Sequence, residues 1–163
     1  MTRAALLDRS AAGELARYAL LHFATHARML PSSGLAAHLR LSDDELLLPE
    51  VLGLRLGGGL VVLSTCEGAA VDALPGEEVL SLSWAFLAAG ACGVLASLWR
   101  IDDRAAARVM VAFYEELRAH RDASLALAYA QRRLIAEGEA AQGEPGPEWW
   151  GSLVLTGDGR LRE

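Results

Sequence analysis

Apolar positions in this chain fall into two patterns, short continuous runs and longer segments with helical spacing. The clearest continuous run is Leu60–Thr65, which is rich in β-branched residues. Such a run is typical of a strand buried on both faces, as in parallel sheets. Three further runs of strand length cover residues 18–25, 92–99 and 152–156. The pattern therefore predicts about four core strands.

Helical patterns lie around and between these strands. Residues 3–17, 77–89, 102–120 and 123–137 carry apolar residues at helical spacing, and Gly138 is expected to end the last of these helices. Pro49 suits the first position of a further short helix. Residues 42–44 form a Ser-Asp-Asp cluster that favours a turn, so residues 36–48 are predicted to form a small hairpin.

This alternation of strands and helices indicates the α/β class. Right-handed crossovers between successive strands produce a mainly parallel sheet with helices on both faces. The chain has 163 residues, the length of one ordinary domain, and no linker or internal repeat divides it. We therefore expect a single domain spanning residues 1–163.

Composition and charge narrow the classes of partner. Hydrophobic residues make up 53% of the chain, which is typical of compact globular proteins. The net charge of −6 provides no basic face for phosphates, so nucleic acids and anionic membranes are poor partners. Proteins, peptides and small molecules remain as candidate ligands.

Two features bear on the compartment. Residues 79–99 carry no charge over a length that would span a bilayer, but Gly90 and Gly93 divide them into a helix-like and a strand-like part. A buried helix–strand pair explains the run better than a membrane span. The chain has two cysteines and no recognisable signal peptide at its start, so we expect a reducing, cytoplasmic setting.

Two reactive side chains directly follow predicted strands. His26 comes after the first strand and Cys66 after the second. Functional crevices of open parallel sheets lie beyond the carboxyl ends of the strands, so adjacent strands would bring the imidazole and the thiol together. A histidine that takes the proton of a thiol creates the nucleophilic thiolate. The alternative is that Cys66 is a small buried apolar residue and His26 an ordinary loop histidine.

The remaining histidines and glycines point to no cofactor. His22 lies four residues before His26 on the same face of the strand, where a supporting or packing role is expected. His38 and His120 share no metal-ligand spacing with the cysteines, so no metal site is expected. The glycines at 57–59 lack the Lys and Ser/Thr of a phosphate-binding loop and are interpreted as a turn.

The chain contains, in order, the stretches HFATHA, LVVLSTCEGA, GEEVLSLSWAFLAAGACGVLASLWRIDD and WWGSLVLTGD. These four stretches resemble the CHAT domain family of caspase-like cysteine peptidases, which is related to caspases and separases. The resemblance implies a three-layer α/β/α caspase-like fold. Family domains are commonly about twice as long, so the chain resembles the carboxyl-terminal half and its sheet is expected to be incomplete. An unpaired edge strand invites pairing, so a missing amino-terminal half, a partner chain or a homodimer is expected.

The resemblance also implies roles for individual residues. Cys66 would be the nucleophile and His26 its general base, with the backbone N–H groups of Cys66 and Ala27 holding the oxyanion. The residues implied to border the substrate are Glu67, Trp99, Asp102 and Asp103, and Asp103 would favour a basic residue at P1. Helix capping is the alternative role for Asp102 and Asp103.

The function expected from these observations is that of a cysteine endopeptidase acting on a protein substrate in bacterial regulation or defence. The main alternative is an inactive pseudo-peptidase that serves as an interaction module. Two departures from the family pattern favour that alternative: Ala27 stands where the family usually has Gly, and Gly68 where it usually has Thr. A small-molecule hydrolase with the same Cys-His pair is a third candidate.

Overall fold

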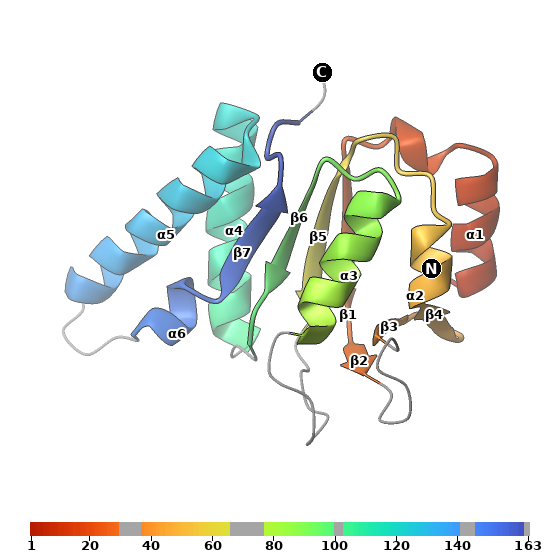
Figure 1. Cartoon of the computed structure of the whole chain (residues 1–163). Helices are drawn as coiled ribbons and strands as arrows, with labels where there is room; N and C mark the ends of the chain where they lie inside the picture. Colours follow the sequence, from red (N-terminus) through yellow and green to blue (C-terminus); the bar gives the residue numbers. More distant parts are fainter. Residues whose placement is uncertain (30–36, 66–76, 100–102, 141–145, 162–163) are drawn as a thin grey trace.

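The structure is a computed structural model that describes residues 1–29, 37–65, 77–99, 103–140 and 146–161. Strands and helices alternate along the chain, as the apolar pattern predicts (Figure 1). The elements in chain order are α1 (Arg3–Ala11), η1 (Leu15–Arg17), β1 (Leu20–Thr25), β2 (Ala27–Met29), β3 (Ala37–Arg40), β4 (Glu45–Leu47), α2 (Leu48–Leu52), β5 (Leu60–Thr65), α3 (Glu77–Ala88), β6 (Gly93–Ser97), α4 (Asp103–His120), α5 (Ala123–Ala140), α6 (Pro147–Trp150) and β7 (Leu153–Gly157).

A four-stranded sheet with the order β1-β5-β6-β7 forms the centre of the molecule. The first three strands are parallel, and β1 and β5 pair over their full length, from Leu20 opposite Leu60 to Thr25 opposite Thr65. All four predicted strands are present, and the sheet is mainly parallel as expected. Because β1 and β5 are neighbours, their carboxyl ends lie side by side.

The last strand, β7, runs antiparallel to β6. Two long helices, α4 and α5, lie between these strands in sequence, and Figure 1 shows them packed side by side. Helix α4 carries the chain back to the edge of the sheet where the parallel strands begin, and α5 returns it to the edge where they end. Strand β7 therefore starts at that second edge and runs in the opposite direction. The N–H of Ala123, at the start of α5, donates to the carbonyl of Gly159, just beyond β7, at 2.7 Å.

Helix α5 differs from its prediction at its carboxyl end. It continues past Gly138 to Ala140, whereas Gly138 was expected to end it. A Cβ at Gly138 would meet no atom within 4 Å, so the glycine lies on an open face of the helix. A glycine there costs only about 1 kcal/mol relative to alanine, which is not enough to stop a helix that packs along its other face.

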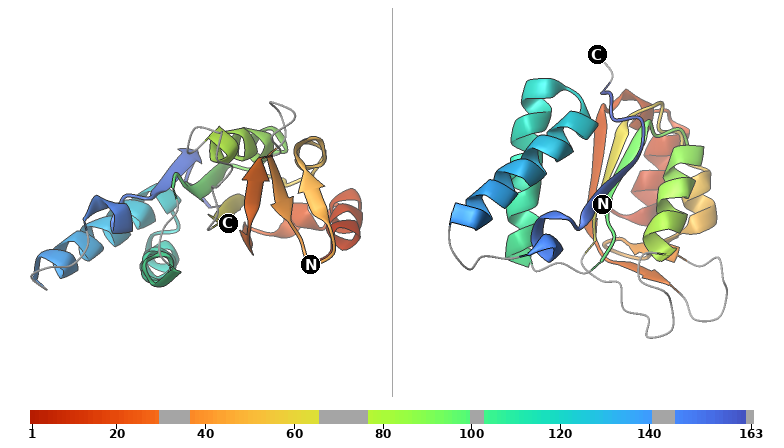
Figure 2. Two further views of the ribbon diagram at one scale, coloured as in Figure 1. Left: turned by 90° about the horizontal axis from the view of Figure 1, so that it is seen from below. Right: turned by 60° about the vertical axis from the view of Figure 1, so that its left-hand side comes forward.

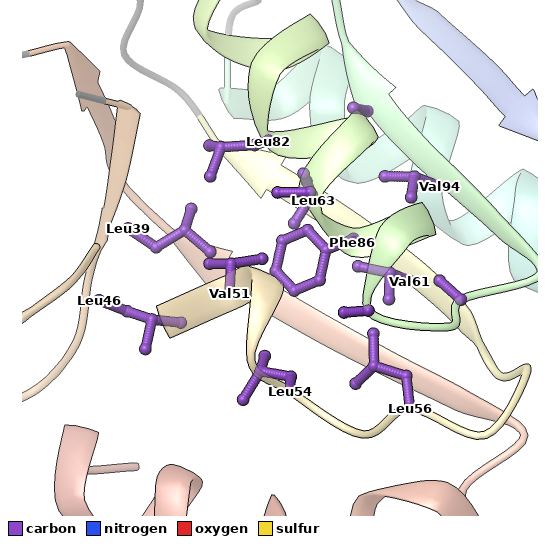
Figure 3. Packing of buried hydrophobic residues seen from close by; sticks show 14 of the residues in the cluster. Leu39, Leu46, Val51, Leu54, Leu56, Val61, Leu63, Leu82, Phe86 and Val94 are labelled. Atoms are coloured by element: carbon purple, nitrogen blue, oxygen red, sulfur yellow. The ribbon is translucent and has the colours of Figure 1, made fainter. Parts of the chain in front are cut away.

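Two apolar clusters lie on opposite faces of the sheet and make the molecule a three-layer α/β/α structure (Figure 2). The first cluster, the α3-side cluster, brings Phe86 of α3 against Val61 and Leu63 of β5, and Figure 3 shows these side chains converging. The second, the α4-side cluster, joins Phe113 of α4 to Val62 of β5. Successive residues of β5 therefore point alternately into the two clusters.

The predicted hairpin is confirmed and is part of a second, smaller sheet with the order β2-β3-β4. Strands β3 and β4 are antiparallel, with Arg40 opposite Glu45 across the turn. Strand β2 was not predicted because it is only three residues long, reads Ala-Arg-Met and follows β1 after a single residue, His26.

The glycines before β5 form a turn, as expected. Gly57 and Gly58 have φ angles of 59° and 87°, in the left-handed region that favours glycine. A Cβ at Gly59 would lie 2.5 Å from the carbonyl oxygen of Tyr18, so the small residue lets β5 begin close to β1. The uncharged run at 79–99 is divided between α3 and β6, and none of the helices that the structure describes is long and apolar enough to cross a membrane.

Candidate active site

The carboxyl ends of β1, β5 and β6 meet at one edge of the sheet, where the sequence predicted the site. His26 follows Thr25, the last residue of β1, and Thr25 lies opposite Thr65, the last residue of β5. Cys66, Glu67, Asp102 and Gly68 lie outside the described residues. Of the predicted catalytic pair, the structure therefore describes only His26.

The small sheet holds the backbone on both sides of His26. The carbonyl oxygen of His26 accepts a hydrogen bond from the N–H of Arg40 at 2.9 Å. The hydroxyl of Thr25 donates to the carbonyl oxygen of Arg40. The imidazole of His26 is on an exposed residue, so the main chain is fixed while the side chain remains accessible.

The N–H of Ala27, one of the two predicted oxyanion donors, is directed away from β3. The bond between Arg40 and His26 marks those residues as a hydrogen-bonded pair of an antiparallel ladder. Such pairs alternate with non-bonded ones, and Ala27 opposite Leu39 is the next pair, so the N–H of Ala27 is not used in pairing with β3. The methyl group of Ala27 is 1% exposed and belongs to the α3-side cluster.

Two of the predicted substrate-binding residues are described, and both lie beyond the carboxyl end of β6. Trp99 is a large apolar residue that is 39% exposed, and its carbonyl oxygen accepts a hydrogen bond from the hydroxyl of Ser97 at 2.6 Å. Asp103 is exposed in the first turn of α4, where its carboxylate also complements the helix dipole. The sheet therefore places both residues at the same edge as His26, with β5 between.

His22 takes the supporting role that the sequence suggested. Its Nδ1 lies 2.9 Å from the hydroxyl oxygen of Tyr114 on α4, and the two rings are 5.8 Å apart. Partial burial lowers the pKa of His22 below its ordinary value and raises the pKa of Tyr114 to about 12, because desolvation disfavours the charged forms. The pair ties β1 to α4 four residues before His26.

A cleft of about 520 Å³ runs beside β1 toward His26, and its volume is in the range of ligand-binding pockets. Among the described residues that line it, Arg40 supplies a guanidinium. The residues that line it are Met1, His22, Phe23, Ala24, Thr25, His26, Arg40, Leu41 and Ser42. Among the described parts of the chain, no group of three or more His, Cys, Asp or Glu side chains is arranged to hold a metal ion.

Tyr114 and Arg40 were not singled out from the sequence. Tyr114 is 92 residues from His22, and in the sequence it cannot be told apart from the other positions of an amphipathic helix. Arg40 looks like an exposed residue at the end of a hairpin strand. A local pattern carries no signal for either role, because both depend on which elements pack against β1.

Comparison with known proteins identifies the family of this chain. The model of the family described as "CHAT domain" matches residues 1–158. Over 120 residues the chain is 35% identical to the human protein "Tetratricopeptide repeat protein 28". That match covers 72% of this chain and 5% of the human protein. The chain therefore corresponds to a small part of that much longer relative.

Proposed function

We propose that this chain, which belongs to the CHAT domain family, is a cysteine endopeptidase. Members of that family are related to caspase-like peptidases. In this proposal Cys66 is the nucleophile and His26 the general base. Glu67, Trp99, Asp102 and Asp103 would border the bound protein substrate. The proposal includes a cytoplasmic location, because a thiol nucleophile stays reduced most readily in the cytoplasm.

The observation that carries the proposal is the register of β1 and β5. Thr25 and Thr65 are directly opposite each other in adjacent parallel strands, and His26 and Cys66 are the next residues. Neighbouring strands lie about 4.8 Å apart, so Thr25 and Thr65 end their strands at the same edge of the sheet, about one strand spacing apart. The described even-numbered residues of β1 and β5 face α4.

The reaction follows from these groups. His26 accepts the thiol proton of Cys66, and the thiolate sulfur bonds to the carbonyl carbon of the scissile peptide. The carbonyl oxygen becomes an oxyanion, which the N–H groups of Ala27 and Cys66 stabilise. The imidazolium then gives its proton to the leaving amine as the C–N bond breaks. Water, deprotonated by His26, hydrolyses the thioester and restores the thiol.

The burial of Ala27 supports activity over the pseudo-peptidase alternative. The concern raised by alanine at this position is that its methyl group crowds the oxyanion. The methyl group is instead packed in the α3-side cluster, and the N–H is not used in pairing with β3. An alanine therefore fits here without occupying the side of the backbone that an oxyanion needs.

The test is cleavage of a peptide library, together with labelling by a peptidyl thiol-directed probe. Cys66→Ala and His26→Ala should each lower cleavage by at least about 10³-fold, the scale seen when one member of a catalytic pair is removed. Cys92→Ala is the matched control, because Cys92 precedes β6 at the opposite edge of the sheet. It should retain cleavage and labelling. Cleavage that survives in Cys66→Ala would refute the assignment.

A further inference from the structure

The segment that follows β6 leads from the core to the surface within two residues. All five residues of β6, Gly93–Ser97, are buried. Trp99 is 39% exposed, and it is one of the residues proposed to border the substrate. The chain therefore has to leave the sheet in a defined direction if the indole of Trp99 is to keep one position at the edge of the site.

Two hydrogen bonds restrain this segment. The hydroxyl of Ser97, the last residue of β6, donates to the carbonyl oxygen of Trp99 at 2.6 Å. The N–H of Leu98 donates to the carbonyl oxygen of Ser152 at 2.8 Å, which extends the pairing of β6 with β7 by one residue. One bond thus fixes the backbone just before Trp99, and the other fixes the carbonyl group of Trp99 itself.

The β7 side of this anchor is held by α5. The side-chain amide of Gln131 donates to the carbonyl oxygens of Trp150 and Leu153, at 3.1 and 3.3 Å. Ser152 lies between these two residues in the chain and is 0% exposed. Since its carbonyl oxygen accepts the bond from Leu98, the segment after β6 is attached to a part of the fold that is itself restrained.

Ser97 occupies a position that packing alone would give to an apolar residue. Successive residues of β6 alternate between the two clusters, with Ala96 in the α3-side cluster and Leu95 in the α4-side cluster. Ser97 continues this alternation toward α4, is 5% exposed and lies opposite Leu153, a member of the α4-side cluster. A buried hydroxyl costs free energy unless it is hydrogen-bonded. What serine contributes here beyond filling space is the bond to Trp99.

We propose that Ser97 is a positioning residue of the site, whose hydroxyl holds Trp99 as a fixed apolar wall for the bound peptide. The inference rests on the proposed function for the identity of the ligand, but the restraint on Trp99 is observable without it. A wall that is already ordered binds a substrate side chain without the cost of immobilising the indole at that moment. Without the bond, substrate binding has to order Trp99, so KM should rise while kcat changes little.

Fluorine NMR of the full chain labelled with 5-fluorotryptophan tests the restraint directly. The resonance of Trp99 is the one that is lost in Trp99→Phe. Ser97→Ala should shift or broaden this resonance, because the indole then samples more than one position, and Ser97→Thr, which keeps the hydroxyl, should restore it. Ser83→Ala is the matched control, because Ser83 is also a buried serine, 2% exposed, but lies on α3. It should leave the Trp99 resonance unchanged.

Cleavage kinetics test the consequence for the substrate. The substrate is a library peptide with large apolar residues near the scissile bond, because an indole surface favours apolar contacts. Ser97→Ala should raise KM about fivefold, which corresponds to the net contribution of one hydrogen bond, and leave kcat within about twofold. If the serine acts through the indole, Ser97→Ala should add nothing to the loss already caused by Trp99→Ala.

Three results would overturn the proposal: an unchanged Trp99 resonance in Ser97→Ala, a loss in kcat with KM unchanged, or losses that add in the double variant. Failure of the peptidase assignment gives a different result. In that case the wild-type chain cleaves no peptide, or cleavage survives Cys66→Ala. The fluorine spectra then still decide whether Ser97 restrains Trp99.

Discussion

Strands β1 and β5 are adjacent, parallel and equally long, yet their surroundings differ sharply. In β5, Leu60, Val61, Val62 and Leu63 are each at most 1% exposed. In β1, the residues opposite them are less buried: Leu20, Leu21 and Phe23 are partly buried and His22 is exposed. The difference arises because β5 has a strand on each side and a helical layer on each face, whereas β1 is an end strand of the sheet as far as the structure describes the chain. Its α4-facing residues His22 and Ala24 are exposed.

The two strands differ in what they contribute: β5 mainly stabilises the fold, and β1 carries groups that are available for function. Strand β5 links the two apolar clusters, because its alternate residues belong to each of them. Strand β1 instead exposes polar groups, and it carries His26 and the wall of the cleft. Accessible backbone and side chains are what a binding or catalytic edge needs, so the less buried strand is the one suited to chemistry.

The largest difference is expected when a charge is placed at positions that face each other across the two strands. Val62→Lys puts an ammonium into the α4-side cluster, and such a charge costs several kcal/mol without a partner, so little folded protein should form. His22→Lys changes the residue opposite it, which is exposed but contacts Tyr114, and should cost only about 1 kcal/mol, the net contribution of one hydrogen bond. Circular dichroism and urea unfolding measure both. Similar losses from both variants would remove the contrast between the strands.

A smaller difference is expected when side-chain volume is removed from the α3-side cluster. Leu63→Ala should lower the free energy of unfolding by about 2–5 kcal/mol, because Leu63 is 1% exposed and its loss leaves a cavity. Phe23, opposite Leu63, packs on Phe86 with ring centroids 5.3 Å apart but is only partly buried. Phe23→Ala should therefore cost less than the about 3–5 kcal/mol typical of a fully buried phenylalanine.

The comparison of these two alanine variants is informative because phenylalanine is the larger residue. If burial decides the loss of unfolding free energy, Leu63→Ala on β5 should lower it as much as or more than Phe23→Ala on β1. A clearly greater loss for Phe23→Ala would mean that β1 contributes to the core as much as β5 does. Urea denaturation with matched slopes provides the measurement.

The smallest expected effect is a pH dependence specific to β1. Burial lowers the pKa of His22 below its usual 6.5, so the folded state favours the neutral imidazole. That contribution to stability is complete above pH 6.5 and is lost as the pH falls from there to the lowered pKa of the folded state. Stability should thus decrease on acidification, and His22→Phe should remove that part of the slope. Tyr114→Phe, which keeps the ring over His22, should retain most of it.

No titratable group lies in the buried part of β5, so the corresponding substitution there makes a useful control. Val62→Ala should lower the unfolding free energy by a similar amount at every pH. A slope that persists in His22→Phe would mean that another histidine produces it.

Much of the fold followed from local patterns. The buried run Leu60–Thr65 matches β5 residue for residue, and the turn at residues 42–44 lies between β3 and β4 as predicted. His26 and Cys66 were singled out because they follow apolar runs, and the structure places His26 at the end of β1 as expected. The carboxyl-terminal helix and strand were less predictable. The end of α5 and the direction of β7 depend on how α4 and α5 pack, which no local signal reports.

The sequence by itself determined which segments are strands and helices and which reactive residues follow them, because side-chain periodicity records burial on each face. Only the tertiary structure decided that β1 and β5 are neighbours, with Thr25 opposite Thr65, and that Tyr114 and Arg40 lie against β1. The physical reason is that the order of strands is set by the paths of the crossovers and by packing between distant segments. These contacts join residues far apart in the chain, and the hydrophobic pattern of either segment is the same with or without its partner.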